Sequence, residues 1–253
     1  MKIVILGAGN VASHLARAFS GAGHKVAVWN RSESSLKLIA DELGCPCTAD
    51  MEALPKDADA YIISVRDDAV DSVAEQLAHT LGKTKATVAH TAGSLPKSLL
   101  DERFEHGGVL YPMQTFSRDK ALDYKEIPFF VEEQGDVLKW LALTVSEHVF
   151  SLTSEQRKVL HLASVFACNF ANHCYTIAED ILKQIDIPFA VLLPLIKETT
   201  QKASILSPRE AQTGPAVRED ETVLGSQIDL LDSRPDLRDI YIRMSNSIIK
   251  YKE

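Results

Sequence analysis

Short apolar runs alternate with amphipathic segments along the first part of the chain. The run AYIISV (residues 60–65) is apolar throughout, as expected of a strand that is buried on both faces of a parallel sheet. Alternation of such runs with helical segments is typical of a doubly wound α/β layer. We predict strands over residues 1–6, 25–29, 45–48, 60–65, 87–90, 108–111, 128–131 and 149–152, and helices over 11–22, 36–43, 68–81 and 135–147.

The pattern changes at about Ser154, where a long helical segment begins. Residues 154–185 are apolar on nearly all sides, and a helix without a wet face must be enclosed by other helices or by a second subunit. Shorter helices are predicted over residues 190–206, 222–231 and 235–249. We therefore predict a doubly wound, parallel α/β domain over residues 1–152 and an all-helical domain over residues 153–253, which forms a homodimer through its helices.

Composition and charge narrow the classes of function. Of 253 residues, 45% are hydrophobic and 25% charged, as in ordinary soluble globular proteins. A formal net charge of −8 argues against a nucleic-acid partner, and no apolar run reaches the ~20 residues that a membrane span needs. The four cysteines have no CxxC spacing, which favours free thiols in the cytoplasm. No metal site is predicted, because Cys168, His173 and Cys174 point to different faces of one helix.

The segment IVILGAGNVA carries the pattern G-x-G-x-x-A at Gly7, Gly9 and Ala12. It directly follows the first strand and opens the first helix, which is the context that a dinucleotide-binding turn requires. Gly7 allows a tight turn, and Gly9 lets the backbone approach a pyrophosphate without an intervening Cβ. The phosphates would bind the amides at the helix N-terminus, around Asn10 and Val11. These residues predict a Rossmann domain with a bound dinucleotide.

The residues that follow the second strand select between NAD and NADP. A carboxylate at this point hydrogen-bonds the ribose hydroxyls of NAD and would repel a 2′-phosphate. This chain has Asn30, Arg31 and Ser32 instead. Arg31 can pair with the phosphate and stack on the adenine, and the Ser32 hydroxyl adds a donor. NADP(H) is therefore the predicted cofactor, with a solvated surface charge as the alternative role of Arg31.

Two further loops should line the cofactor site, because ligands bind outside the carboxyl ends of the strands. Ser64 and Val65 follow the fourth predicted strand, and Thr91 follows the fifth. Asp67 serves equally well as the N-cap of the next helix. His90 is as consistent with a buried structural histidine as with a functional one.

These motifs together resemble those of a known superfamily, the 6-phosphogluconate-dehydrogenase-like reductases. It includes pyrroline-5-carboxylate reductase, the β-hydroxyacid dehydrogenases and the deazaflavin-dependent NADP oxidoreductases. The broad resemblance rests on GAGNVA (7–12), NRS (30–32), ISVRDDAV (63–70) and HTAGS (90–94). A narrower one, to bacterial proteins that join a Rossmann-like domain to a C-terminal helical domain of unassigned function, rests on YPMQTFS (111–117), HLASVFACNF (161–170) and TGPAVREDET (213–222). The resemblance spans nearly the whole chain and implies a 6-phosphogluconate-dehydrogenase-like C-terminal domain, whose long helix packs against its dimer mate.

The long helix departs from the superfamily at one point. The β-hydroxyacid dehydrogenases place a lysine there with an asparagine one turn later, whereas here Lys158 is followed four residues on by Leu162. That proton donor is therefore not carried over. The helix offers His161 and Asn169 as catalytic candidates, and histidine is suited to acid–base chemistry near neutral pH. We predict His161 as proton donor or substrate anchor near the nicotinamide, although a structural role fits the sequence equally well.

Two polar segments are expected to bind the substrate. Gln114 and Thr115 supply uncharged donors and acceptors suited to a small polar molecule. Thr213, Arg218 and Asp220 belong to a turn-rich segment whose length inside a helical domain favours a functional loop. Arg218 could grip a substrate carboxylate or pair with Asp220, and Asp220 could instead cap the next helix.

Together, these features predict a cytoplasmic NADPH-dependent oxidoreductase that transfers a hydride to a small C=O or C=N substrate in the cleft between its domains. One alternative is a deazaflavin-coenzyme:NADP oxidoreductase, which needs a much larger second pocket. Another is a regulatory protein that binds NADP(H) without chemistry, an alternative raised by the missing lysine.

Overall fold

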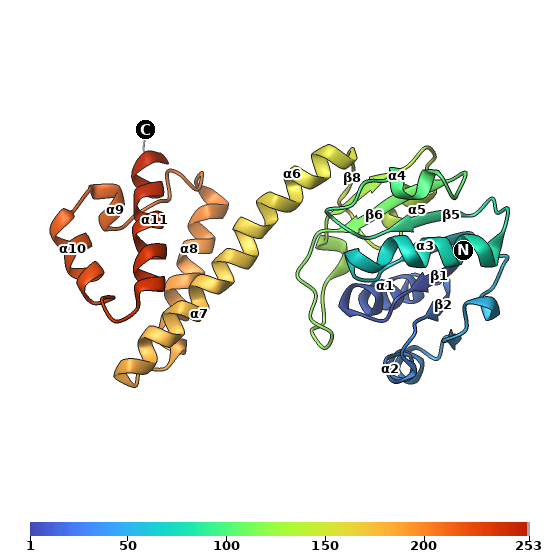
Figure 1. Ribbon diagram of the computed structural model, residues 1–253, viewed down its shortest axis with the longest axis horizontal. Helices are drawn as coiled ribbons and strands as arrows, with labels where there is room; N and C mark the ends of the chain where they lie inside the picture. Colours follow the sequence, from blue (N-terminus) through green and yellow to red (C-terminus); the bar gives the residue numbers. More distant parts are fainter. Residues whose placement is uncertain (252–253) are drawn as a thin grey trace. The chain divides into compact units, whose positions relative to one another are not determined.

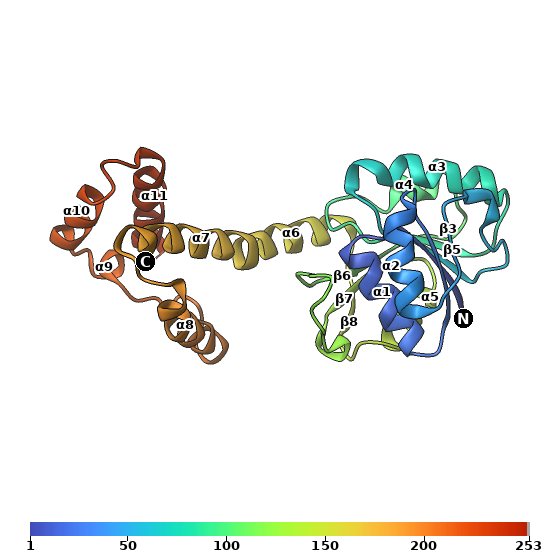
Figure 2. The same ribbon diagram turned by 90° about the horizontal axis from the view of Figure 1, so that it is seen from below.

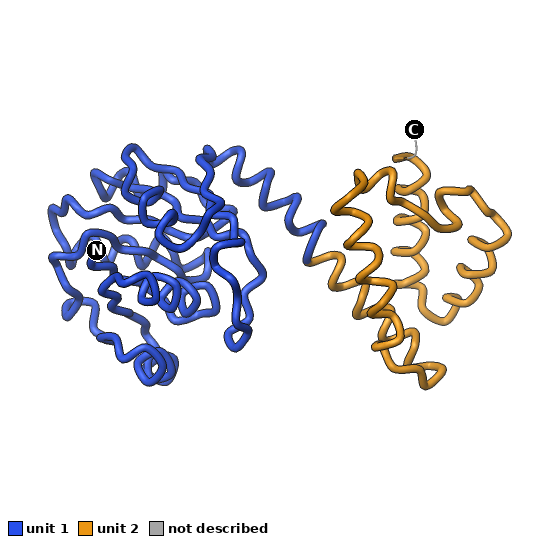
Figure 3. Tube along the Cα trace, turned by 180° about the vertical axis from the view of Figure 1, so that it is seen from behind, with its two compact units in different colours: residues 1–168 blue, residues 169–253 orange. Residues whose placement is uncertain are grey.

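The computed structural model describes residues 1–251 and divides the chain into two compact units, residues 1–168 and 169–253 (Figure 3). The first unit contains an eight-stranded sheet with helices on both faces, and the second is helical (Figure 1). This confirms the predicted fold class, a doubly wound α/β domain followed by an all-helical one. Within residues 1–251, no helix is long and apolar enough to cross a membrane.

The sheet has the strand order β3-β2-β1-β4-β5-β6-β7-β8. Its central strands carry apolar residues on both faces, which explains their continuous apolar runs in the sequence. The strands are β1 (Lys2–Leu6), β2 (Lys25–Trp29), β3 (Cys47–Thr48), β4 (Ala60–Ile63), β5 (Thr87–His90), β6 (Gly107–Pro112), β7 (Phe129–Glu132) and β8 (Val149–Ser151).

The sheet is parallel from β3 to β6, but β7 runs antiparallel to β6, a direction that the sequence pattern does not predict. A parallel connection requires a crossover, usually a helix. The segment between β6 and β7 instead forms a loop with one short turn, η3 (Tyr124–Glu126). Side chains of the first helix hold this loop: Asn10 donates to the carbonyl of Phe116, His14 bonds the carbonyl of Ser117, and Arg17 donates to the carbonyl of Arg118.

The helices of the first unit cover both faces of the sheet (Figure 2). They bury two separate apolar clusters, one on each face. One face is covered by α1 (Asn10–Gly21), α2 (Glu33–Leu43) and α5 (Val137–Leu143). The other is covered by α3 (Val70–Leu81) and α4 (Ser98–Asp101), with the short turns η1 (Met51–Ala53) and η2 (Asp67–Ala69) nearby in sequence.

The predicted long helix is confirmed, as a continuous helical path from residue 154 to residue 185. It consists of α6 (Ser154–Ser164), a π-helical segment η4 (Val165–Phe170), α7 (Ala171–Leu182) and η5 (Lys183–Ile185). The two compact units divide within it, after Cys168, whereas the sequence pattern changes at Ser154. The difference arises because Arg157, in the first turns of α6, forms an ion pair with Glu132 at the end of β7 and is only 1% exposed. This contact joins the start of α6 to the unit that contains the sheet, called the sheet unit from here on.

The second unit continues with η6 (Phe189–Leu192), α8 (Leu193–Ile205), α9 (Pro215–Arg218), α10 (Glu221–Asp229) and α11 (Pro235–Tyr251). The last three helices pack together, and Tyr241 of α11 donates to Gln227 of α10 at 2.5 Å. The helix α9 lies within the segment that the sequence pattern presents as a turn-rich loop. Of the described residues in this unit, the buried ones are Ala216 and Leu237.

Candidate cofactor and active site

Gly7 forms the tight turn after β1, and no other residue fits its position. Its φ is +132°, and a Cβ there would lie 2.1 Å from the carbonyl oxygen of Ser64. Gly9 is different, because a Cβ there would meet nothing within 4 Å and the residue is exposed. The turn is therefore packed on its inner side and open on its outer side, as the approach of a pyrophosphate requires.

The N-terminus of α1 is not capped by a side chain of the chain itself. Gly9 occupies the N-cap position. The side-chain nitrogen Nδ2 of Asn10 donates to the carbonyl of Phe116 at 2.9 Å and does not cap the helix. The first-turn amides are thus left for a ligand, next to the partial positive charge of a 12-residue helix. These residues fit the pyrophosphate of a dinucleotide.

The turn after β2 presents Arg31 to solvent. Asn30 is held by its backbone bond to Thr48 at 3.3 Å, and Ser32 is the N-cap residue of α2. No ion pair or hydrogen bond engages the Arg31 side chain within the described part of the chain. A free guanidinium at this position fits a 2′-phosphate.

Three loops meet at the carboxyl edge of the sheet. Thr91 donates to the Ser64 hydroxyl at 3.2 Å, and Val65 lies 3.4 Å from the position that a Cβ of Gly7 would take. Ser94 bonds the carboxylate of Asp67, so Asp67 ties two loops together and does not cap a helix. The structure thus brings together four predicted cofactor residues: Gly7, Ser64, Val65 and Thr91.

His90 has a structural role. It is fully buried, its Nδ1 accepts from the backbone amide of Ala92 at 3.2 Å, and its Nε2 lies 3.3 Å from the carbonyl of Pro96. Burial lowers the pKa of His90 to about 4, although the bond to Pro96 acts in the opposite direction. A neutral imidazole that bridges backbone groups accounts for both ring nitrogens.

His161 lies at the same edge of the sheet, against the loop after β5. A Cβ at Gly93 would be 2.6 Å from His161 Nδ1, and the Tyr111 hydroxyl lies 3.1 Å from that nitrogen. Burial raises the pKa of Tyr111, with Ser164 and Arg157 acting in the opposite direction. The sequence motifs HTAGS and YPMQTFS contain Gly93 and Tyr111, but nothing local shows that they meet on His161.

Arg157 anchors α6 one turn before His161. It donates to the Glu132 carboxylate at 2.6 Å and to the carbonyl of Leu95 at 2.5 Å, and Ser154 also donates to Glu132 at 2.7 Å. Burial alone would raise the pKa of Glu132, but the bonds from Arg157 and Ser154 outweigh it and hold that pKa below its ordinary value.

The opposite face of α6 points to solvent, where Lys158 pairs with Glu155 at 3.0 Å. The face toward the sheet therefore presents Arg157 and His161, four residues apart, and Lys158 takes no part in it.

The other predicted site residues remain predictions. Gln114 and Thr115 are exposed, and the Thr115 amide donates to Gln114 Oε1 at 2.8 Å. Asp220 caps α10 by accepting from the Val223 amide at 3.1 Å, and no ion pair joins it to Arg218. Asn169, Thr213 and Arg218 are exposed residues of the second unit.

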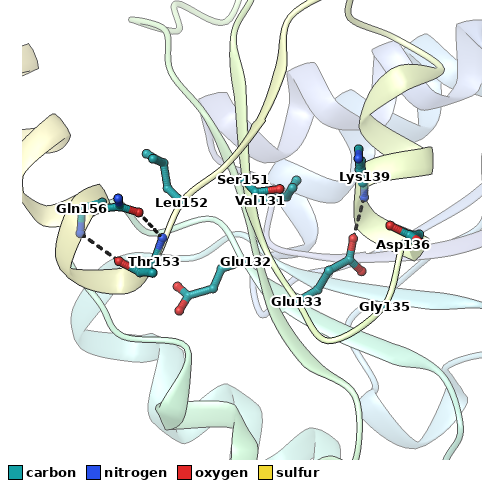
Figure 4. Close-up of a pocket in the computed structure, with 10 residues that line it drawn as sticks. All are labelled: Val131, Glu132, Glu133, Gly135, Asp136, Lys139, Ser151, Leu152, Thr153 and Gln156. Carbon is teal, nitrogen blue, oxygen red and sulfur yellow. Dashed lines mark hydrogen bonds between the residues drawn. The ribbon is translucent and has the colours of Figure 1, made fainter.

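A hollow of about 310 Å³ lies beside the carboxyl ends of β7 and β8 (Figure 4). The helix N-termini beside it are already satisfied. Thr153 and Gln156 cap α6 reciprocally, and the Glu133 carboxylate accepts from the Lys139 amide at 2.8 Å. With acidic side chains and filled caps, this hollow does not suit an anionic dinucleotide.

Comparison with known proteins agrees with this geometry. Residues 2–93 match the family described as NADP oxidoreductase, coenzyme F420-dependent, and residues 127–248 match a domain of unknown function, DUF2520. The structure resembles that of a candidate NADP oxidoreductase from Bacteroides fragilis, with 41% identity, a TM-score of 0.92 and 98% of each chain covered. The chain belongs to this family of Rossmann-like, NADP-dependent oxidoreductases with a C-terminal helical domain, which confirms the predicted family, enzyme class and cofactor.

More distant structures share the fold. A protein from Thermotoga maritima is 18% identical, with a TM-score of 0.75 over 99% of this chain and 98% of that one. An imine reductase from Myxococcus stipitatus, in complex with NADP⁺, is 16% identical, with a TM-score of 0.72 over 99% and 93% of the two chains. No curated protein matches the sequence significantly.

Proposed function

We propose that the protein uses NADPH to reduce a small C=O or C=N compound at the carboxyl edge of its sheet, beside His161. The observation that carries this proposal is the continuous row of loops at that edge. Thr91 bonds Ser64, which packs on the glycine turn, and Gly93 packs on His161. A titratable side chain therefore lies next to the loops that the fold uses for its cofactor.

Different residues of the chain bind the different parts of NADPH. The open N-terminus of α1 and Gly9 bind the pyrophosphate, and Arg31 with Ser32 binds the 2′-phosphate. When bound, NADPH supplies a hydride. The pair of Tyr111 and His161 supplies the proton that the reduced oxygen or nitrogen must gain.

Oxidation of NADPH with a panel of 2-oxo acids, cyclic ketones and cyclic imines tests this proposal. We expect turnover with at least one class, and a loss of ~100-fold or more in His161→Asn with NADPH affinity unchanged. NADPH binding without turnover of any compound would support a regulatory protein instead.

A second candidate is hydride exchange with a deazaflavin coenzyme, which the family matched by residues 2–93 favours. Such a coenzyme is large and would need a second pocket beside the NADP(H) site. Reduction of a deazaflavin coenzyme by NADPH, followed through the coenzyme's absorbance, separates the two functions.

The protein is also proposed to act as a homodimer through its C-terminal helices, in the cytoplasm, where its four free cysteines would stay reduced. The support for a dimer is the exposure of large apolar side chains, including Val159 (69%), Leu195 (63%) and Ile205 (82%). Exposed apolar surface on this scale usually marks an interface.

Light scattering at micromolar concentration should give about twice the 27.9 kDa monomer mass. Leu195→Asp should shift the mass toward that of the monomer. The matched control, Leu38→Asp, places the same charge on an exposed leucine of the sheet unit and should leave the mass unchanged. A monomer mass for the unaltered protein would contradict the dimer.

A further inference from the structure

We propose that Tyr111 donates the proton to the substrate, and that His161 then returns a proton to Tyr111. This proposal rests on the proposed function, because it concerns the proton step of that reduction. It assigns the direct contact with substrate to a residue that the sequence motifs alone do not single out as an acid.

Three chain segments meet at one point to form this pair. Tyr111 comes from the carboxyl end of β6, His161 from α6 and Gly93 from the loop after β5. The Tyr111 hydroxyl lies 3.1 Å from His161 Nδ1, and the rings meet edge to face at 72°. A Cβ at Gly93 would lie 2.6 Å from His161 Nδ1 and 3.1 Å from the Tyr111 ring, so the pair depends on a glycine there.

The contact has two proton arrangements. With a neutral His161 that carries its proton on Nε2, the phenol donates to Nδ1 and its proton points into the pair. With a cationic His161, Nδ1–H donates to the phenol oxygen, and the phenol proton is free to point outward. Only the second arrangement offers a proton from Tyr111 to a substrate atom.

The proton step then balances. The substrate carbon takes the hydride with its electron pair, and the substrate oxygen or nitrogen takes the proton as the O–H bond of Tyr111 breaks. The Nδ1–H bond of His161 breaks in turn and restores the phenol. His161 is left neutral and regains a proton from solvent, so one hydride and one proton are consumed in each turnover.

Two features favour Tyr111 over His161 as the group that touches substrate. The Nδ1 side of the His161 ring is closed by the phenol and by the backbone of Gly93. Tyr111 belongs to a strand end at the edge where the fold binds its cofactor, and the predicted substrate residue Gln114 follows three positions later. Burial, which raises the pKa of Tyr111, keeps the phenol protonated near neutral pH.

The test compares two variants with two matched controls. Tyr111→Phe removes the hydroxyl but keeps the ring, and should lower turnover ~100-fold or more at unchanged NADPH affinity. Gly93→Ala keeps both side chains but forces them apart, and should lower turnover ~10- to 100-fold, because misplacement by about 1 Å can cost 10²-fold.

The controls are Tyr61→Phe and Gly21→Ala. Tyr61 is fully buried in β4 and bonds the carbonyl of Pro55, and a Cβ at Gly21 meets nothing within 4 Å. Both controls should stay within twofold of the unaltered protein.

A second readout needs no turnover. In the free protein, the ¹⁵N resonance of His161 Nδ1 should shift when Tyr111→Phe removes its partner, and an unchanged resonance overturns the proposal. Turnover of Tyr111→Phe within threefold of the unaltered protein, while His161→Asn is inactive, makes His161 the direct donor and overturns this proposal alone. Absence of any carbonyl or imine reduction removes the proposed function and this step with it.

Discussion

The two units of the chain treat their apolar residues in opposite ways. In the sheet unit, neighbouring residues of β1 such as Val4 and Ile5 are fully buried in separate clusters on the two faces of the sheet. In the helical unit, Ile205 is 82% exposed and Leu230 is 81% exposed. The first unit buries an apolar core on each face of its sheet, whereas among the described residues of the second unit only Ala216 and Leu237 are buried.

The helix α6 shows the same contrast within a few turns. Its polar residue Arg157 is 1% exposed where it bonds Glu132 at the end of β7, whereas Val159 is 69% and Leu162 is 59% exposed. Full burial of such a side chain is worth ~1.5–3 kcal/mol, so burial of many of them by a second subunit would stabilise the proposed dimer. If the dimer forms as proposed, the stability of the helical unit should depend on protein concentration, and that of the sheet core should not.

The largest effect that tests this contrast is the loss of a core side chain. Phe19 of α1 is fully buried, and Phe19→Ala should lower the free energy of unfolding by ~3–5 kcal/mol at every protein concentration. Ile205→Ala should affect stability only through association, and so only in a concentration-dependent way. Urea unfolding at two protein concentrations measures both. An equal loss at both concentrations for Ile205→Ala would show that this side chain stabilises the monomer and not an association.

Local patterns explain why most of the sheet unit could be predicted from the sequence. Each buried strand is a continuous apolar run, and the glycine turn is marked by its motif between the first strand and the first helix. The direction of β7 could not be predicted in this way. It depends on the path of a loop that three side chains of α1 hold in place.

The candidate site was less accessible to prediction, because its contacts are not local. Tyr111 and His161 are separated by 50 positions, and Glu132 and Arg157 by 25. A charged residue in a helix normally faces water, so nothing in the sequence predicts the burial of Arg157. The histidine itself could be chosen from its type and from its place near the start of the long helix that follows the last strand, but its partner could not.

Cofactor selection gives the next largest effect, and it assigns NADP(H) binding to the sheet unit. A charge-assisted hydrogen bond contributes ~1.5–3 kcal/mol, so Arg31→Ala should weaken NADPH binding by roughly 10- to 150-fold. NADH has no 2′-phosphate, and its affinity should not change. Fluorescence titration with each cofactor measures the difference.

Arg243→Ala is the matched control for Arg31→Ala. It removes an exposed arginine of α11 in the helical unit, whose side chain is 78% exposed, and should leave both affinities unchanged. A loss of NADPH affinity in this control, or none in Arg31→Ala, would show that the sheet unit does not select the cofactor through this turn.

The smallest effect is expected at the start of α6, where the buried face of the helix and its exposed apolar face begin. Thr153 caps this helix by accepting from the Gln156 amide at 3.3 Å, while Gln156 accepts from the Thr153 amide at 2.9 Å. Thr153→Ala should lower the free energy of unfolding by ~1 kcal/mol, because one amide of the first turn loses its partner. Thr153→Ser keeps the hydroxyl and should recover most of that loss.

The effect of Thr153→Ala should also be confined to the first turn of α6. Arg157 still holds the helix to Glu132 and Leu95 in this variant, so His161 should keep its place beside Tyr111. Hydrogen exchange should therefore speed up at the first-turn amides of α6, with turnover unchanged. If turnover falls together with stability, the cap and not the buried Arg157 positions the helix, and the sheet unit does not secure α6 in the way that its contacts indicate.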